Sequence, residues 1–335
     1  MIENIKTIAD LAGFLASDAG TLKEFIPDNY YKTFLIPKPG STEKRIIETP
    51  AGILRTWLDH IGNELQRLYQ NHKTDAAYGF VRSYKNDCDR RNIYTNARKH
   101  LGKKYLLNID LDNFFHQVDE AKVRNIFTDF QLFSLESDTE EILTKLVTYH
   151  GRTPMGSPTS PPLSNFATIS LDHALLKWAT HSSFTYTRYV DDLSFSSNME
   201  ISQTHFIQIN EILLEHRFVA DKNKIKWYGK NEEKEITGLL LSNKIRIPDA
   251  FLNEFNNDLD TFKNIWIMAH QYPDHHVFEW ITKLDQVING RLAFLSMIYT
   301  RHHKIYQDYL KKIELIKHSH ETELSCSWRY AGYEF

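Results

Sequence analysis

The chain opens with apolar residues at helical spacing. From Ile2 to Leu15 they recur every three or four positions, which predicts short N-terminal helices. Residues 31–50 form two runs of β type joined by Pro-Gly-Ser-Thr, a sequence typical of a hairpin. Helical spacing returns over 52–72 and through most of 119–150. This part of the chain therefore predicts helices interrupted by one hairpin.

The middle of the chain mixes the two periodicities. The segment "KYLLNIDLDNFF" predicts a short apolar strand that ends in carboxylates, and "TRYVDDLSFS" alternates as a hairpin does, with two aspartates at its tip. After Pro248 the spacing is helical almost to the end, which predicts a separate C-terminal subdomain. The remaining expected elements are a breaker-rich segment at 151–165, helices at 166–180 and near 202–216, and strand-like runs at 218–229, 234–242 and 244–248.

Length and composition limit the number of domains and the cellular compartment. The 335 residues exceed one average domain, so we expect a mixed α/β protein of two or three subdomains. Cys88 and Cys326 lie far apart without metal-type spacing, no apolar leader precedes the first helix, and no window resembles a membrane span. We therefore expect a cytoplasmic protein with reduced thiols and no membrane partner.

The net charge of −3 hides two basic segments. Residues 82–104 carry eight Lys or Arg against two Asp, and residues 301–318 carry five against Asp308 and Glu314. Each segment alone is equally consistent with a solvated surface. Two such segments flanking an acidic centre favour a groove for a phosphate backbone.

Three carboxylates form that acidic centre. Asp110 ends the apolar strand, and Asp191 and Asp192 occupy the hairpin tip, where turn chemistry alone would also explain an aspartate. If they converge, their repulsion requires a cation, and Mg²⁺ is a hard ion that takes carboxylate and phosphate oxygens. Two such ions can clamp the attacking and leaving oxygens of a phosphoryl transfer. The residue types permit this chemistry.

The order of these motifs resembles reverse transcriptases. "NIDLDNFF" resembles the first palm motif, "TPMGSPTSPPLSN" the second, "YVDD" the third, "ADKNKIK" the fourth, and "EKRIIETP" the fingertip motif. The resemblance implies a right-hand polymerase fold: N-terminal helices over 1–30, fingers and palm over 31–245, and a helical thumb with a C-terminal tail over 246–335. Met155 stands where the family usually has Gln, which removes an amide from the second motif.

Two further elements resemble those of retron reverse transcriptases. "NARKH" (96–100) is similar to their Asn-Ala-x-x-His element, and "ITGL" (236–239) to their Val-Thr-Gly element. Taken alone, His100 is equally a packed histidine and Thr237-Gly238 an ordinary strand-end turn. The resemblance implies a set of residues that recognise RNA: Asn96, Ala97, His100, Ile236, Thr237 and Gly238.

The resemblance also implies roles at the catalytic centre. Asp110 and Asp191 would bridge two Mg²⁺ ions, for which Mn²⁺ could substitute, and Asp192 would be a supporting ligand or an electrostatic partner. Leu111 would add its backbone carbonyl, and Phe115 would exclude a ribose 2′-hydroxyl. The implied nucleotide-binding residues are Lys44, Arg45, Phe115, Gly156, Ser157 and Lys224.

The function implied first is an RNA-directed DNA polymerase of retron type that makes branched, RNA-linked single-stranded DNA (msDNA) in antiphage defence. Its partners would be a cognate structured noncoding RNA, the DNA product, dNTPs, and an effector or toxin protein. A second hypothesis keeps the polymerase but places it among other bacterial defence or group II intron-like enzymes. A third is a catalytically silent RNA-binding scaffold, against which the intact Asp110, Asp191, Asp192 and Phe115 argue.

Overall fold

The computed structural model describes residues 1–37, 44–83, 88–129, 132–271 and 275–318. The chain divides into two compact units, Met1–Thr237 and Gly238–Phe335. The division falls before the predicted boundary at 245/246, and the N-terminal helices pack within the first unit and share its core. The described helices include none that is long and apolar enough to cross a membrane.

The N-terminal helices are stabilised by local caps. In α1 (Ile8–Phe14) the side chains of Thr7 and Asp10 form a reciprocal capping box, and Asp18 caps α2 (Ala19–Glu24). Short 3₁₀ turns precede and follow these helices, at Ile2–Asn4 and Pro27–Tyr30. The short N-terminal helices expected from the spacing are therefore present.

The predicted hairpin pairs β1 (Tyr31–Pro37) with β2 (Lys44–Pro50) in antiparallel register, and its connection at 38–43 lies outside the described residues. Helix α3 (Gly52–Tyr69) follows at once and buries one face, including Leu58, Ile61 and Leu65.

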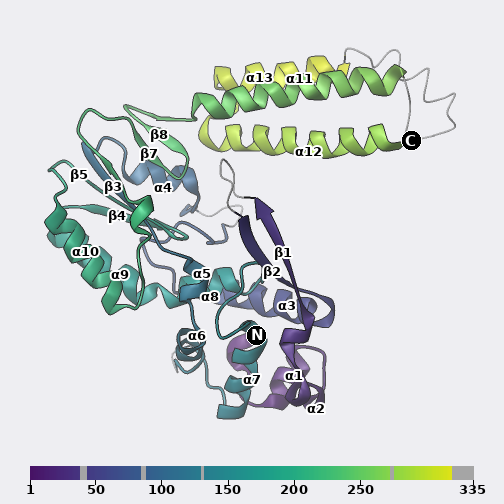
Figure 1. Ribbon diagram of the computed structural model, residues 1–335, viewed down its shortest axis with the longest axis vertical. Coiled ribbons are helices and arrows are strands. Elements are labelled where there is room, and N and C mark those ends of the chain that lie inside the picture. The colour runs from purple at the N-terminus through teal and green to yellow at the C-terminus, as the bar shows by residue number, and fades with distance from the viewer. Residues whose placement is uncertain (38–43, 84–87, 130–131, 272–274, 319–335) are drawn as a thin grey trace. The chain divides into compact units, whose positions relative to one another are not determined.

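The first unit contains a four-stranded antiparallel sheet in the order β4-β5-β3-β6, of which β3, β4 and β5 are labelled in Figure 1. Successive side chains alternate between its faces. Tyr186 and Phe195 point toward α9 (Ile169–His181), whereas Thr187 and Ser196 point toward the end of α4 (Ile93–Lys99). The strands are β3 (Tyr105–Asp110), β4 (Thr185–Tyr189), β5 (Asp192–Ser197) and β6 (Lys226–Tyr228).

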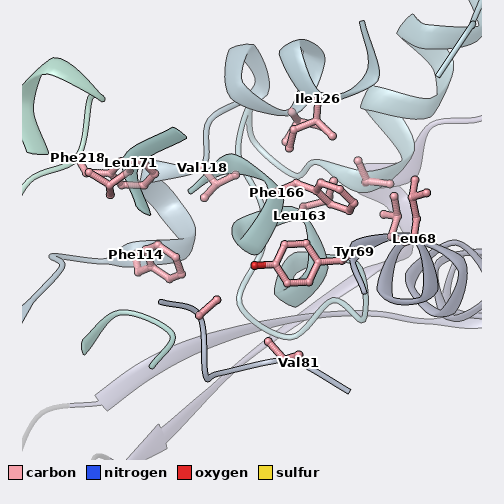
Figure 2. Close-up of a cluster of buried hydrophobic side chains, with 14 of the residues drawn as sticks. Leu68, Tyr69, Val81, Phe114, Val118, Ile126, Leu163, Phe166, Leu171 and Phe218 are labelled. Atoms are coloured by element: carbon pink, nitrogen blue, oxygen red, sulfur yellow. The ribbon is translucent and has the colours of Figure 1, made fainter. Parts of the chain in front are cut away.

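Helices cover both faces of this sheet, and others pack around α3. Figure 2 shows the core there, where Tyr69, Phe166, Leu163 and Phe114 are among the side chains that pack together. These helices are α4 (Ile93–Lys99), α5 (Phe114–Gln117), α6 (Glu120–Phe127), α7 (Ser137–Val147), α8 (Ser160–Ala167), α9 (Ile169–His181) and α10 (Gln203–Glu215).

Two expectations about local structure need correction. The helix expected at 166–180 is present, mainly as α9, but the segment expected to be only breaker-rich contains a separate helix, α8 from Ser160, because Pro161 and Pro162 occupy its first turn, where no backbone N–H is needed. The strand expected over 218–229 is confined to β6, because the Asp221 side chain accepts the Asn223 N–H and fixes a 3₁₀ turn at Lys222–Lys224.

The second unit is mainly a bundle of three helices, which lie side by side in Figure 1. Phe255 stacks on Tyr309 at 4.5 Å between ring centroids, and Arg291 pairs with Asp258 at 2.5 Å. The helical C-terminal region predicted after Pro248 is therefore present. Its elements are β8 (Leu239–Leu241), β9 (Ile245–Arg246), α11 (Asp249–Gln271), α12 (His275–Ile298) and α13 (Lys304–His318); β7 (Lys234–Ile236) ends the first unit.

Candidate active site

The turn between β4 and β5 presents the adjacent aspartates. Tyr189 pairs with Asp192 across the hairpin, so Val190 and Asp191 form its two-residue tip. Val190 has a φ of 63°, in the left-handed region that a β-branched residue rarely adopts. Such a conformation persists only where the surroundings enforce it, so the turn is held by its contacts.

The end of β3 brings the third carboxylate to this turn. Asp110 lies opposite Asp192 in the β3–β5 pairing, and the Leu111 N–H donates to the Asp191 carbonyl at 3.0 Å. Carboxylate oxygens of Asp110, Asp191 and Asp192 consequently lie within 4.8 Å of one another. The predicted convergence of the three is present in the structure.

Lys224 lies against this cluster. Its ammonium group contacts Asp110 Oδ2 and lies 3.5 Å from Asp221 Oδ2. The Asp221 N–H donates to the Asp110 carbonyl at 2.7 Å, which fixes the lysine-bearing segment beside the strand end. The lysine expected at a triphosphate thus contacts a carboxylate in this structure, and its half-exposed side chain remains open to solvent.

Electrostatics at the cluster disfavour three bare charges. Loss of hydration, and then repulsion from Asp110, raises the pKa of Asp191 to about 6. Asp192 is exposed on one side, yet the surrounding protein removes hydration, and repulsion from Asp191 adds to that effect, so its pKa rises to about 7. Lys224 lowers both pKa values but does not cancel the repulsion.

The donor set fits a hard divalent cation. All three side chains offer carboxylate oxygens, the ligands that Mg²⁺ and Mn²⁺ prefer. Asp110 Oδ1 is buried and has no hydrogen-bond partner in the described part of the chain. A buried carboxylate oxygen without a donor is costly, and a cation would satisfy it.

The candidate nucleotide-binding residues fall into two groups. Lys44 and Arg45 are exposed on β2, and Arg45 lies near enough to lower the pKa of Asp191 by charge attraction. Phe115 is half-buried at the start of α5, where its ring lies 6.0 Å from that of Phe80 and its carbonyl accepts the Thr153 hydroxyl at 2.6 Å. These side chains are accessible at least in part.

Gly156 and Ser157 pack against β2. A Cβ on Gly156, whose φ is 131°, would lie 2.9 Å from the Glu48 carbonyl oxygen, so only glycine fits. Glu48 also donates its N–H to Met155 and forms a two-bond ion pair with Arg152 at 2.8 and 2.9 Å. Ser157 is buried, so in this structure its side chain is not available to a nucleotide.

The "NARKH" residues lie in and just after α4. Asn96, Ala97 and His100 are buried, and the His100 ring bonds the hydroxyls of Thr187 and Ser196 at 2.7 Å each. Burial lowers the pKa of His100 to about 3, so the ring is neutral. These side chains are not available to contact RNA directly, and His100 is a packed histidine.

The second retron-like element lies close to the first, because α4 packs against β7. Ile236 ends β7 and is buried, whereas Thr237 is half-buried with a φ of 47°. The Thr237 hydroxyl has no hydrogen-bond partner in the residues that the structure describes. Gly238 is exposed with a φ of 77°.

The sequence reasoning missed the buried support of the catalytic turn. Arg188 and Asp172 form an ion pair at 2.8 Å, and both side chains have no exposed surface. The signal was present, because Arg188 alternates with Tyr186 on the face of the hairpin that also carries Leu193 and Phe195, and a charge on such an apolar face requires a buried partner.

Comparisons with known proteins agree with this site. The family model for reverse transcriptase (RNA-dependent DNA polymerase) matches residues 36–241, which include the three carboxylates. Retron Ec86 reverse transcriptase from Escherichia coli is 25% identical over 299 residues, covering 87% of this chain and 83% of the relative. Retron Ec83 reverse transcriptase from the same organism is 28% identical over 243 residues, covering 69% and 74%.

A third relative matches a smaller part of both chains. Retron Mx162 reverse transcriptase from Myxococcus xanthus is 32% identical over 185 residues, covering 50% of this chain and 36% of that protein. The fold, the carboxylate site and the family match define a nucleotidyltransferase, and the chain belongs to the reverse transcriptase family. Its curated relatives place it among the retron-type enzymes, so it is an RNA-directed DNA polymerase.

Proposed function

We propose that this polymerase adds deoxynucleotides at the Asp110, Asp191 and Asp192 cluster with two Mg²⁺ ions. The observation that supports this is the convergence of the three carboxylates within 4.8 Å, one of them with a buried oxygen that lacks a donor. When bound, the two ions would supply charge for the attacking and leaving oxygens. Asp110 and Asp191 would hold both ions, Asp192 would support them, and Leu111 would add its backbone carbonyl.

Basic residues next to the cluster would bind the triphosphate. Lys224 has an ammonium group at the carboxylates, and Arg45 acts on Asp191 from β2. Fixed cations stabilise the charge that develops on a leaving pyrophosphate. Lys44, the first residue of β2, and the Gly156 and Ser157 backbone would complete the site.

Phe115 would select the sugar. It lies in α5, five residues after Asp110, and its ring is 6.0 Å from that of Phe80. A ring packed next to another cannot withdraw from a 2′-hydroxyl, so it would exclude ribonucleotides by collision.

The architecture supports a right-hand arrangement as part of this proposal. The β1–β2 hairpin and α3 would serve as fingers, the four-stranded sheet with its helices as palm, and α11–α13 as thumb. The basic segments 82–104 and 301–318 would contact the phosphate backbone.

The product would be that of a retron. A cognate structured RNA would be both template and primer, and the DNA would remain joined to it as msDNA, with an effector protein as partner in antiphage defence. Thr237 and Gly238 would contact the RNA, whereas the buried Asn96, Ala97, His100 and Ile236 would act by shaping the α4–β7 surface.

Primer extension tests the metal site. Asp191→Asn should lower Mg²⁺-dependent dNTP incorporation by more than about 100-fold, the upper end of the loss seen when only an outer partner of a metal ligand is removed. Asp112→Asn is the matched control, since Asp112 is an exposed neighbour outside the cluster. Substantial synthesis by folded Asp191→Asn would contradict the assignment.

Sequencing the nucleic acid that co-purifies with the wild-type protein tests the retron product. A short RNA covalently joined to DNA is the expected result. Unlinked DNA, or random cellular RNA alone, would contradict the msDNA part of the proposal while leaving the polymerase intact.

A further inference from the structure

One buried side chain contacts both the arginine that holds the catalytic turn and the segment next to Phe115. Asn165, in α8, has no exposed surface. Its Oδ1 accepts Arg188 Nη1 at 3.2 Å, and its Nδ2 donates to the carbonyls of Gly79 and Phe80 at 3.1 and 3.3 Å. The amide therefore joins two segments that lie far apart in the sequence.

The first segment carries the catalytic turn. Arg188 Nη1 also donates to the Val190 carbonyl at 3.1 Å, directly before Asp191. The rest of its guanidinium is fixed by Asp172, at 2.9 Å from Nε and 2.8 Å from Nη2. Arg188 thus holds the residue whose left-handed backbone aims the metal-binding aspartates, and Asn165 orients the same nitrogen.

The second segment supports the sugar site. A Cβ on Gly79 would lie 2.5 Å from the Val190 nitrogen, so this segment touches the catalytic turn directly. Phe80, with a φ of 55°, places its ring next to that of Phe115, at 6.0 Å between centroids. An unfavourable backbone needs enforcing contacts, and the Asn165 amide supplies one of them.

We propose that Asn165 is a specificity-determining positioning residue, which fixes the turn before Asp191 and the ring next to Phe115 relative to each other. The inference has two parts, called the sugar arm and the metal arm. The sugar arm, an effect on nucleotide sugar selection, rests on the proposed role of Phe115, whereas the metal arm, an effect on the metal site, depends only on the three carboxylates. Asn165 touches neither substrate nor metal ligand, and acts through Arg188 on one side and through Phe80 on the other.

Two variants separate the arms. Asn165→Asp keeps an acceptor for Arg188 but places an oxygen, in place of the amide NH₂, against the carbonyls of Gly79 and Phe80. The variant should therefore free the Phe80 segment while leaving the turn before Asp191 in place. We expect the ratio of rNTP to dNTP kcat/KM to rise about 3- to 10-fold, the effect of losing one buried hydrogen bond, with the Mg²⁺ requirement unchanged. Asn165→Ala loses both contacts and should also raise the Mg²⁺ concentration needed for half-maximal rate.

Ser164→Ala is the matched control, because Ser164 is buried in the same helix and, among the described residues, its hydroxyl bonds only the Pro161 carbonyl, at 2.8 Å. If Asn165 has a structural role alone, both Asn165 variants would lower rNTP and dNTP use in proportion, with the Mg²⁺ requirement unmoved, and this result would overturn the inference. Ser164→Ala should leave both the sugar ratio and the Mg²⁺ requirement as in the wild type. Thermal melting shows which variants fold.

Phe80→Leu keeps the test decisive if neither Asn165 variant folds. It leaves the buried amide in place and removes only the ring, so the sugar ratio should rise; an unchanged ratio would overturn the sugar arm. If Phe115→Ala itself leaves the ratio unchanged, the proposed gate fails. The proposed effect of Asn165 on the metal site is tested separately, by the Mg²⁺ requirement of Asn165→Ala. If that requirement equals that of the wild type, this part of the inference is overturned.

Discussion

Replacing Asp191 by Asn should stabilise the metal-free protein at pH 8. In the folded state the carboxylate is held near Asp110 and Asp192 and has lost hydration, whereas in the unfolded chain it is solvated. Asn has nearly the same shape and no charge. The substitution that removes activity should therefore raise the free energy of unfolding.

The size of the gain in the free energy of unfolding follows from the pKa of Asp191. Its rise from 3.8 to about 6 corresponds to about 3 kcal/mol, since one pKa unit is about 1.4 kcal/mol. For two charges 4.8 Å apart, Coulomb's law gives a similar repulsion energy, about 3.5 kcal/mol per pair at an effective dielectric constant of about 20. Allowing for solvent screening of a half-buried group, we expect a gain of about 1–3 kcal/mol.

The pH dependence has a definite sign. Because the folded-state pKa is raised, the folded protein binds more protons than the unfolded chain between pH 4 and pH 6, and wild-type stability falls as pH rises through this range. The advantage of Asn should be fully present at pH 8, fall to about half at pH 5, and be nearly absent only at about pH 3.5, below both pKa values.

Thermal melting in EDTA at these pH values measures this effect, with Asp112→Asn as control. A gain of about 1–3 kcal/mol corresponds to a few degrees in Tm for a chain of this size. Mg²⁺ should then stabilise the wild type more than the variant, because binding to the folded state adds to its stability. An Asp191→Asn variant less stable than wild type at pH 8 in EDTA, or a gain that is as large at pH 3.5 as at pH 8, would refute the reasoning.

Three other substitutions probe separate parts of the site. Phe115→Ala should raise rNTP use relative to dNTP use several-fold in single-nucleotide incorporation, and an unchanged ratio would make Phe115 a core residue. Replacing both Thr237 and Gly238 by Ala should weaken use of the cognate RNA but spare extension of an arbitrary annealed primer, and equal loss on both substrates would place them in the fold. His100→Gln should reduce the loss of stability as pH falls below about 6.5, because the buried ring, with its pKa lowered to about 3, cannot accept the proton that the unfolded chain binds; parallel stability curves for the variant and the wild type would contradict the neutral, buried ring.

Local patterns in the sequence were sufficient for much of this protein. The spacing of apolar residues predicted the N-terminal helices, the β1–β2 hairpin, β3 and the helical C-terminal region, because amphipathic periodicity is a property of neighbouring residues. The order of the motifs around Asp110, Asp191 and Asp192 was sufficient for the reverse transcriptase family. Residue type and order carry that information without coordinates.

Long-range packing decided the rest. The pairing of Asp110 with Asp192 depends on the register of two strands about 80 residues apart in the chain, which no local pattern specifies. The burial of Asn96, His100 and Ser157 likewise depends on which elements cover them. The buried pair of Arg188 and Asp172, and the Asn165 amide beside it, exist only because α8, α9 and β4 meet, and a charge can be placed in a core only where the fold supplies its partner.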